Sequence, residues 1–278
     1  PYPMPQYAPH LVEHYNKVAH GEQTTTHIDL VLQQRVEELA SHWSRELRLE
    51  NINDLSIVVE EVASGEIVAY CGNCDMSYDR HGKWVDIARS PRSSGSILKP
   101  LLYAVALQEG VILPETLLPD VPTDFGGFAP KNFDGSYAGA IAADEALALS
   151  LNIPNVHLLK EYGVAPFART LQQAGFKSLN RSADEYGLSL VLGGAEVRLV
   201  DVVSCYSKMA ACYADPAAYP DFPIRDRVAL YNTFTAMREV NRPDQMDWRR
   251  AVSVQNVAWK TGTSYGARDA WAVGVTPR

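Results

Sequence analysis

The sequence predicts an α+β fold, in which an antiparallel sheet is flanked by helices and joined to an all-helical part. Two observations predict it. A pair of β-rich runs separated by a short turn occurs near each end of the chain, at residues 55–70 and 252–275. Between these two hairpins, apolar residues recur mainly at three- and four-residue steps, which is the period of a helix. Two hairpins with helices between them can join one antiparallel sheet.

Length and composition narrow the class of protein. A chain of 278 residues with 46% hydrophobic and 21% charged residues can bury a sizeable core and is typical of globular proteins. The 33 acidic residues exceed the 25 basic ones and give a net charge of -8, which argues against nucleic-acid binding. No apolar run approaches the roughly 18 residues of a membrane helix, and no signal-peptide pattern is present. Because the chain starts with Pro1 and not with methionine, we interpret it as part of a longer protein.

Residues 1–26 are rich in proline and then polar, which predicts a linker or arm from an upstream domain, with one domain from 27 to 278. The arm contains His10, Glu13 and His14 in the H-x-x-E-H pattern of zinc peptidases. Two histidines at this spacing can share a metal, with Glu13 as base, but the site also needs an interior helix and a third ligand. A solvated, proline-initiated helical turn is the alternative interpretation.

The next helix is predicted from Asp29 to Leu47. Its apolar positions fit one face of an amphipathic helix: Leu30, Leu32, Val36, Leu39, Ala40 and Trp43. The first hairpin follows, and Cys71 and Cys74 lie where its second strand ends. This C-x-x-C pair is compatible with half a zinc site, a redox pair, a disulfide or two ordinary thiols. The remaining cysteines, Cys205 and Cys212, lack that spacing and are predicted, with Met209, to lie in a helix core.

Residues 91–95 have loop composition, and the apolar residues after them predict a helix that starts close to Ser96, with Pro100 in its first turn. Ser96 and Lys99 then lie one turn apart on one face. A serine hydroxyl is a weak nucleophile until a base takes its proton, and a partly desolvated lysine amine can be that base. The alternative is a surface serine at a helix start with a solvated lysine.

The middle of the chain combines a long loop with several helices. Residues 111–139, rich in proline and glycine, predict the loop, and residues 141–151 predict a helix with Ser150 and Asn152 at its end. Pro154 should turn the backbone out of this helix and direct both side chains into a cleft, although a simple helix end is the alternative. Further helices are predicted at 155–162, 166–174, 199–212 and 228–240.

The second hairpin carries Lys260-Thr261-Gly262-Thr263 near the end of its first strand. The chain therefore contains Ser-x-x-Lys, Ser-x-Asn and Lys-Thr-Gly in the order typical of serine enzymes that react with β-lactams. One such pattern arises easily by chance, but three in order do not. On these motifs the chain resembles the penicillin-binding transpeptidases, most closely the 1C-type branch of the bifunctional class A proteins. Four more segments share the likeness: residues 8–11, 91–95, 132–135 and 192–197.

The resemblance implies a fold like that of penicillin-binding proteins and serine β-lactamases. It implies a serine D,D-transpeptidase without cofactor or metal, acting on the D-Ala-D-Ala ends of peptidoglycan stem peptides and acylated by β-lactams. An upstream glycosyltransferase domain is expected in the full protein, which would be anchored on the outer face of the cytoplasmic membrane through a segment outside this chain. A serine β-lactamase and a non-catalytic β-lactam sensor are the rivals. The sequence lacks the Glu-x-x-Leu-Asn segment that would position a hydrolytic water.

The resemblance also implies a role for each catalytic residue. Ser96 would be the nucleophile and Lys99 the base that activates it. Ser150 would relay a proton to the leaving group, with Lys260 supplying positive charge and tuning Ser150. Asn152 would hydrogen-bond the substrate peptide.

The strand residues after Lys260 are expected to bind the substrate. Thr261 and Thr263, with Gly262 between them, would hold the terminal carboxylate of the peptide. The backbone N–H groups of Ser96 and Thr263 would form an oxyanion hole, because acyl transfer needs donors where negative charge develops.

In the family the last strand lies between the two hairpins, and the chain stops at Arg278 before that strand and the C-terminal helix. The segment at 209–223 is also shorter than the family suggests. The resemblance therefore predicts two unpaired sheet edges, which invite aggregation. We expect the chain alone to be poorly soluble and slow to acylate until the downstream segment is added.

Overall fold

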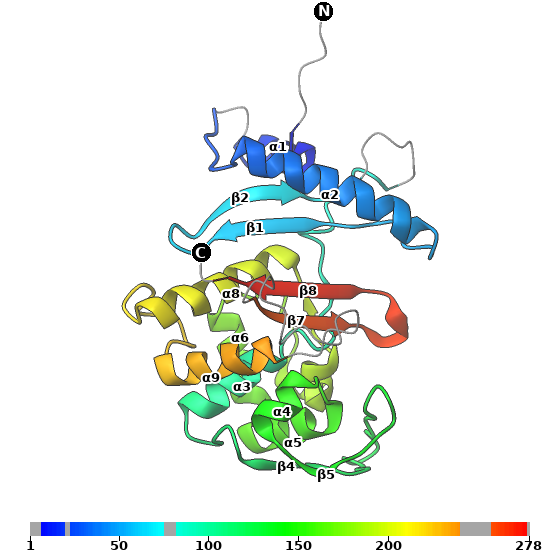
Figure 1. Cartoon of the computed structure of the whole chain (residues 1–278), viewed down its shortest axis with the longest axis vertical. Coiled ribbons are helices and arrows are strands. Elements are labelled where there is room, and N and C mark those ends of the chain that lie inside the picture. The colour runs from blue at the N-terminus through cyan, green and yellow to red at the C-terminus, as the bar shows by residue number, and fades with distance from the viewer. Residues whose placement is uncertain (1–6, 20–22, 75–81, 240–256, 277–278) are drawn as a thin grey trace, which may run out of the picture. The chain divides into compact units, whose positions relative to one another are not determined.

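The computed structural model describes residues 7–19, 23–74, 82–239 and 257–276 (Figure 1). The chain divides into two compact units. The first combines residues 1–91 with 198–207, and the second combines 92–197 with 208–278. The division therefore does not fall at residue 26, where the sequence predicted a boundary.

The first unit contains an antiparallel hairpin covered by a helix. Strand β1 (Ile57–Glu61) pairs with β2 (Glu66–Cys71), with a register shift between Val59 and Glu60. Helix α2 (Leu30–Arg48) lies across this hairpin and packs against β2 (Figure 1). The Asp29 carboxylate accepts a hydrogen bond from Leu32 N at 2.9 Å and so caps the start of the helix. The predicted hairpin and helix are both confirmed.

The buried face of α2 differs from the predicted one. Val36 and Ala40 are buried, but three of the predicted apolar positions are exposed: Leu30, Leu39 and Trp43. Gln33 is wholly buried instead; its Nε2 donates to Tyr70 O at 2.9 Å and its Oε1 accepts from Tyr70 N at 2.7 Å. Among the described strands β2 pairs with β1 alone, so its other edge needs partners. The Gln33 amide supplies them at Tyr70. Asp29 N supplies another by donating to Val68 O at 2.9 Å.

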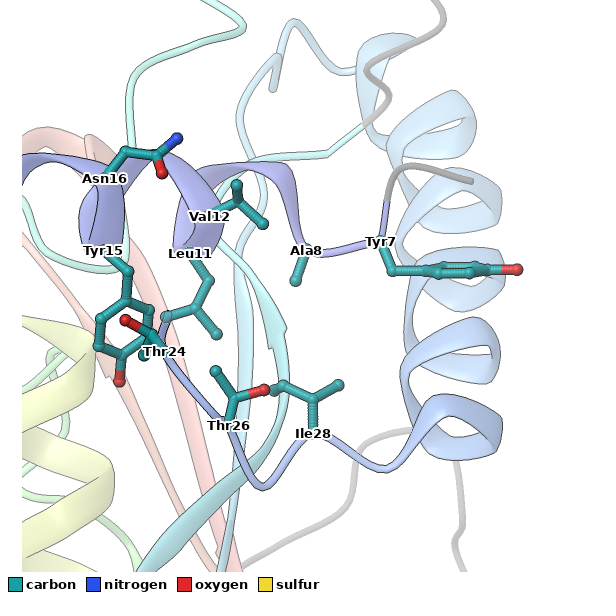
Figure 2. Close-up of a pocket in the computed structure, with 9 residues that line it drawn as sticks. All are labelled: Tyr7, Ala8, Leu11, Val12, Tyr15, Asn16, Thr24, Thr26 and Ile28. Carbon is teal, nitrogen blue, oxygen red and sulfur yellow. The ribbon is translucent and has the colours of Figure 1, made fainter. Parts of the chain in front are cut away.

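Residues 9–18, predicted as part of a linker or arm, form helix α1 (Pro9–Val18). Ala8 and Leu11 are buried in a core cluster with Tyr70 and Ala88, so the start of this segment belongs to the first unit. A cavity of about 310 Å³ lies between α1 and residues 24–28 (Figure 2). It is bordered by none of the residues predicted for catalysis; its lining is Tyr7, Ala8, Leu11, Val12, Tyr15, Asn16, Thr24, Thr26 and Ile28.

The second unit is mainly helical, and its described strands form three short antiparallel pairs. These are β3 (Arg92–Ser93) with β6 (Glu196–Val197), β4 (Leu117–Asp120) with β5 (Gly139–Ala142), and β7 (Ala258–Thr263) with β8 (Ala270–Val275). The helices are α3 (Lys99–Gln108), α4 (Ala143–Ala148), α5 (Asn152–Tyr162), α6 (Val164–Gln173), α7 (Ala183–Tyr186) and α9 (Arg227–Arg238), with 3-10 turns at Gly187–Leu192 and Tyr265–Ala267. Helix α8 (Leu199–Ala214) contributes residues to both units.

Helix α3 is the centre of the second unit's core. Residues 101–106 are at most 1% exposed, and the helix contacts α4, α5 and α9. A helix that is apolar on all sides is buried on all sides. Its first residue, Lys99, is therefore held inside the protein.

The described strands form four separate two-stranded sheets, so the two predicted hairpins are not paired with each other. Strands join a sheet only where their backbones lie about 5 Å apart. Local alternation in a sequence predicts pairing within a hairpin, but it does not predict pairing between hairpins far apart in the chain. The start of the second predicted hairpin, at residues 252–256, lies outside the described residues.

Three boundaries near the predicted motifs also differ. The predicted loop at 111–139 contains β4, and the predicted helix at 141–151 is reduced to α4. Helix α5 begins at Asn152 and not at 155, so Pro154 lies in its first turn. Proline is tolerated there because the N–H it lacks would have no partner within the helix. Pro154 thus starts a helix that it was predicted to end.

Candidate active site

Ser96 lies in the turn that leads into α3, and not in the helix itself. Ile97 N donates to Ser94 O at 3.1 Å and Lys99 N donates to Ser96 O at 3.2 Å, which are the bonds of a tight turn. The helix was predicted to start close to Ser96, but it starts three residues later at Lys99, with Pro100 as its second residue. Ser96 is half-buried, whereas Lys99 is fully enclosed.

The Lys99 amine is held by two carbonyl oxygens. Its Nζ donates to Ser150 O and to Asn152 Oδ1, both at 2.7 Å. Burial lowers the pKa of Lys99 well below its usual value, and the positive charge of Lys260 lowers it further. A neutral amine has two hydrogens and one lone pair. The two carbonyls take the hydrogens, so the lone pair is left to accept a proton.

A second buried lysine contacts the same serine. Lys260, in β7, donates to Ser150 Oγ and to Thr261 O, both at 2.7 Å. Burial lowers the pKa of Lys260 to about 7, so it takes both protonation states near neutral pH. Ser150 therefore binds Lys99 through its carbonyl and Lys260 through its hydroxyl. Its φ of 56° is left-handed, a conformation that costs a non-glycine residue about 1 kcal/mol or more.

The turn that carries Ser96 touches the strand that carries Lys260 through backbone atoms. Gly95 has a φ of 51°, and a Cβ there would lie 2.7 Å from Thr263 N. A Cβ on Gly262 would lie 3.2 Å from Ser96 N. Only residues without a side chain allow this approach. It brings the segments that carry the two predicted oxyanion donors, Ser96 N and Thr263 N, into contact.

Hydrogen bonds with β8 and with residues 193–195 hold the backbone just before Ser96 in place. Trp271 Nε1, in β8, donates to Ser93 O at 2.8 Å. Ser93 Oγ donates to Gly193 O at 2.7 Å, and Ser94 N donates to Ala195 O at 2.9 Å. The 192–197 segment, which is part of the resemblance, thus supports the backbone just before Ser96.

A polar network next to Asn152 was not predicted from the sequence. Asn152 N donates to Asn132 Oδ1 at 2.9 Å, and Asn152 Nδ2 donates to Lys131 O at 2.7 Å. Asn132 Nδ2 in turn donates to Asp120 Oδ1 at 2.7 Å. In the sequence, only the resemblance singles out Asn132. Asp120 carries no local signal, since a single acidic residue in a proline-rich stretch reads as solvated.

The H-x-x-E-H residues of the first unit do not converge on a metal site. His10 is buried, and its Nε2 donates to Lys83 O at 2.8 Å. Glu13 pairs with Lys17 at 2.7 Å on the exposed side of α1. In the described part of the chain, no group of three or more His, Cys, Asp or Glu residues is placed to hold a metal ion. The zinc alternative therefore has no geometric support.

All four cysteines are buried, and none of them forms a disulfide in the described structure. Burial raises the pKa of Cys71 to about 12, which disfavours the reactive thiolate. Cys205, Cys212 and Met209 are completely buried, as predicted for core residues.

The comparison with protein families decides the class. The family model for the penicillin binding protein transpeptidase domain matches residues 55–278. Penicillin-binding protein 1C of Escherichia coli K12 is 36% identical over 283 residues, which is 100% of this chain and 36% of that protein. The chain belongs to the penicillin-binding protein transpeptidase family. The family predicted from the three motifs is thereby confirmed.

Other penicillin-binding proteins are similar as well. Penicillin-binding protein 1A of Neisseria meningitidis serogroup A is 28% identical over 253 residues, covering 80% of this chain and 31% of that protein. The chain thus spans about a third of the length of these curated relatives.

Solved penicillin-binding proteins establish the fold. PonA1 of Mycobacterium tuberculosis matches with a TM-score of 0.72 at 23% identity, covering 98% of this chain and 79% of that one. PonA1 in complex with penicillin V matches with a TM-score of 0.71, also at 23% identity, over 98% and 80% of the two chains. The predicted α+β penicillin-binding-protein fold is confirmed. None of the helices in the described ranges is both long and apolar enough to span a bilayer.

Proposed function

We propose that this transpeptidase domain is a serine D,D-transpeptidase that forms an acyl-enzyme on Ser96. The observation that carries the proposal is the pair of buried lysines, Lys99 and Lys260, which meet on Ser150. Two amines with lowered pKa values beside a serine are costly for stability. They supply what acyl transfer needs, which is a base and a proton path.

In the first half-reaction, Ser96 Oγ attacks the carbonyl carbon of the D-Ala-D-Ala peptide bond as its proton passes to the Lys99 lone pair. The carbonyl oxygen becomes an oxyanion, which the N–H groups of Ser96 and Thr263 stabilise. The C–N bond then breaks. The leaving amine takes a proton from Ser150 Oγ, which regains one from Lys260. The products are an ester on Ser96 and free D-Ala.

In the second half-reaction, the amine of another stem peptide attacks the ester carbonyl. Its extra proton returns through Ser150 to Lys260, and Ser96 Oγ regains its proton from Lys99 as the ester bond breaks. The new peptide bond is the cross-link, and all four catalytic groups are restored. Asn152 would bind the donor peptide, and Thr261 and Thr263 its carboxylate.

A β-lactam amide would acylate Ser96 by the same attack, and PonA1 has been solved in complex with penicillin V. Because the leaving amine of an opened β-lactam stays tethered, the adduct should persist. A labelled penicillin should give a long-lived adduct of one penicillin per chain, and Ser96→Ala should abolish it. An adduct that survives Ser96→Ala would refute the proposal.

Two rivals make different predictions in the same assay. Rapid release of opened penicillin would identify a serine β-lactamase. A stable adduct without transfer of a D-Ala-D-Ala peptide onto an acceptor amine would identify a β-lactam sensor. Release of D-Ala from peptides ending in D-Ala-D-Ala, but not in D-Ala-L-Ala, tests the D,D specificity.

We also propose that the full protein works on peptidoglycan at the outer face of the cytoplasmic membrane. The support is the family itself and the greater length of its members, of which this chain covers about a third. The complete gene tests this, since a glycosyltransferase domain and a membrane anchor are expected upstream.

A further inference from the structure

Three hydrogen bonds join Lys131 and Asn132, at the start of the turn at residues 132–135, to the first two residues of α5. Asn132 Oδ1 accepts from Asn152 N at 2.9 Å and from Ile153 N at 3.3 Å, the first two amides of α5. Lys131 O accepts from Asn152 Nδ2 at 2.7 Å. The turn is closed by Gly135 N, which donates to Asn132 O at 3.1 Å. Asn132 is therefore the cap of α5, supplied from 20 residues upstream.

The orientation of the Asn132 amide is fixed by a buried carboxylate. Asp120 is 1% exposed, and its two oxygens accept from Asn132 Nδ2 at 2.7 Å and from Ala138 N at 2.8 Å. Asn132 Nδ2 also donates to Ser136 O at 2.9 Å. Because both acceptors bind the NH₂ end of the amide, the oxygen must point at Asn152. A charged acceptor makes this the strongest bond of the network.

We propose that Asp120 and Asn132 are positioning residues for the transpeptidase reaction, which hold Asn152 and through it the Lys99 base. The inference rests on the proposed function. Asn152 Oδ1 is one of the two atoms that hold the Lys99 amine. A shift of the start of α5 would move both Asn152 and Ser150, and with them both acceptors of Lys99. Misplacement of a catalytic group by about 1 Å can cost about 100-fold in rate.

The network does not touch the reacting atoms, so its loss should affect chemistry more than binding. For Asn132→Ala, we expect the maximal rate of acylation by labelled penicillin to fall about 100-fold. The dissociation constant of the complex that precedes acylation should change only a few-fold. The matched control is Asp134→Asn in the same turn, whose exposed carboxylate bonds only Ser136 in the described structure. This control should acylate like wild type.

A swap of the two side chains tests the pairing directly. Asn132→Asp alone places two carboxylates face to face in a buried site, and should lose more activity than Asn132→Ala. Adding Asp120→Asn restores one carboxylate and one amide, so the double variant should acylate at least tenfold faster than Asn132→Asp. Ser136 O loses its donor in the double variant, so full recovery is not expected.

The thermal unfolding of each variant is followed by circular dichroism. All acylation rates are then measured at a temperature well below the unfolding midpoint of that variant. The proposal is overturned if folded Asn132→Ala acylates within twofold of wild type, or if its loss lies wholly in binding. It is also overturned if the double variant is no faster than Asn132→Asp. Ser96→Ala in the same series separates the two ideas: labelling that survives it rejects the proposed function, whereas labelling that needs Ser96 but ignores Asn132 rejects only the positioning role.

Discussion

The two units both bury polar side chains, but they satisfy them differently. In the first unit, the Tyr70 hydroxyl donates to the Asp86 carboxylate at 2.6 Å, and Gln33 pairs with the edge of β2. In these two contacts each donor meets an acceptor, and no like charges are brought together. In the second unit, Lys99 and Lys260 are buried side by side on Ser150, and both have lowered pKa values.

This difference distinguishes buried polar groups that stabilise the fold from buried polar groups that we expect to take part in the reaction. A satisfied polar group is the normal state of a protein interior. Two buried amines with lowered pKa values reduce stability, and perturbed groups of this kind cluster at functional sites. The first unit would lose stability, but not activity, if its network were cut. The second should lose activity first.

The largest expected effect is that of Lys99→Arg. A guanidinium stays protonated at working pH and cannot act as a base, so acylation by labelled penicillin should fall about 1000-fold. The matched control is Lys160→Arg on the exposed side of α5, which should label at the wild-type rate. Equal rates for Lys99→Arg and wild type would exclude Lys99 as the base.

Lys260→Met should remove a pH dependence of stability. The pKa of Lys260 is about 7 in the folded chain, against an ordinary value of 10.5. Between these values the unfolded chain binds a proton that the folded chain lacks. Raising the pH from 7 to 10.5 therefore increases the free energy of unfolding, by up to about 1.4 kcal/mol per pH unit for this residue. Lys99 acts with the same sign.

Urea unfolding at several pH values in this window measures that slope. Lys260→Met should give a smaller slope than wild type, while Lys160→Met should leave it unchanged. A slope in Lys260→Met equal to that of wild type would show that Lys260 keeps an ordinary pKa.

The smallest effect is expected in the first unit. Gln33→Ala leaves the backbone N–H and C=O of Tyr70 without partners in a buried place, which should cost about 2 kcal/mol in the free energy of unfolding. The neighbouring exposed residue gives the control, Gln34→Ala, which should cost much less. Both variants should be acylated at the wild-type rate per folded molecule. Slow acylation of folded Gln33→Ala would break the contrast between the units.

The sequence predicted the motif residues because their chemistry is recognisable at short spacing. The structure joins Lys99, Ser150, Asn152 and Lys260 by direct hydrogen bonds, although they come from segments up to 161 positions apart, from 99 to 260. The family likeness, and not periodicity, is what connected them beforehand. Their individual roles remain proposals.

The predictions that differ from the structure share one cause. Local sequence patterns do not show which hydrogen bonds and contacts a residue makes with distant parts of the chain. Gln33 is buried, and Leu39 exposed, because the edge of β2 needs an amide partner that periodicity cannot see. The sequence predicts a helix end at Pro154 because proline disfavours a helical conformation at the residue before it. The cap that Asn132 provides for α5 leaves no trace in that local pattern. No local pattern marks Asp120, because its partners Asn132 and Ala138 lie 12 and 18 residues away in the chain.

The contact made by Gly95 and Gly262 has a consequence for drug resistance. Because the Ser96 turn and the Lys260 strand meet through backbone atoms, any side chain at either glycine would push them apart. Selection by a β-lactam therefore has little room to alter this contact. Substitutions are better tolerated at exposed side chains near the end of β7, such as Tyr265, which is 97% exposed. An inhibitor that binds only the turn and the strand would leave few mutational routes of escape.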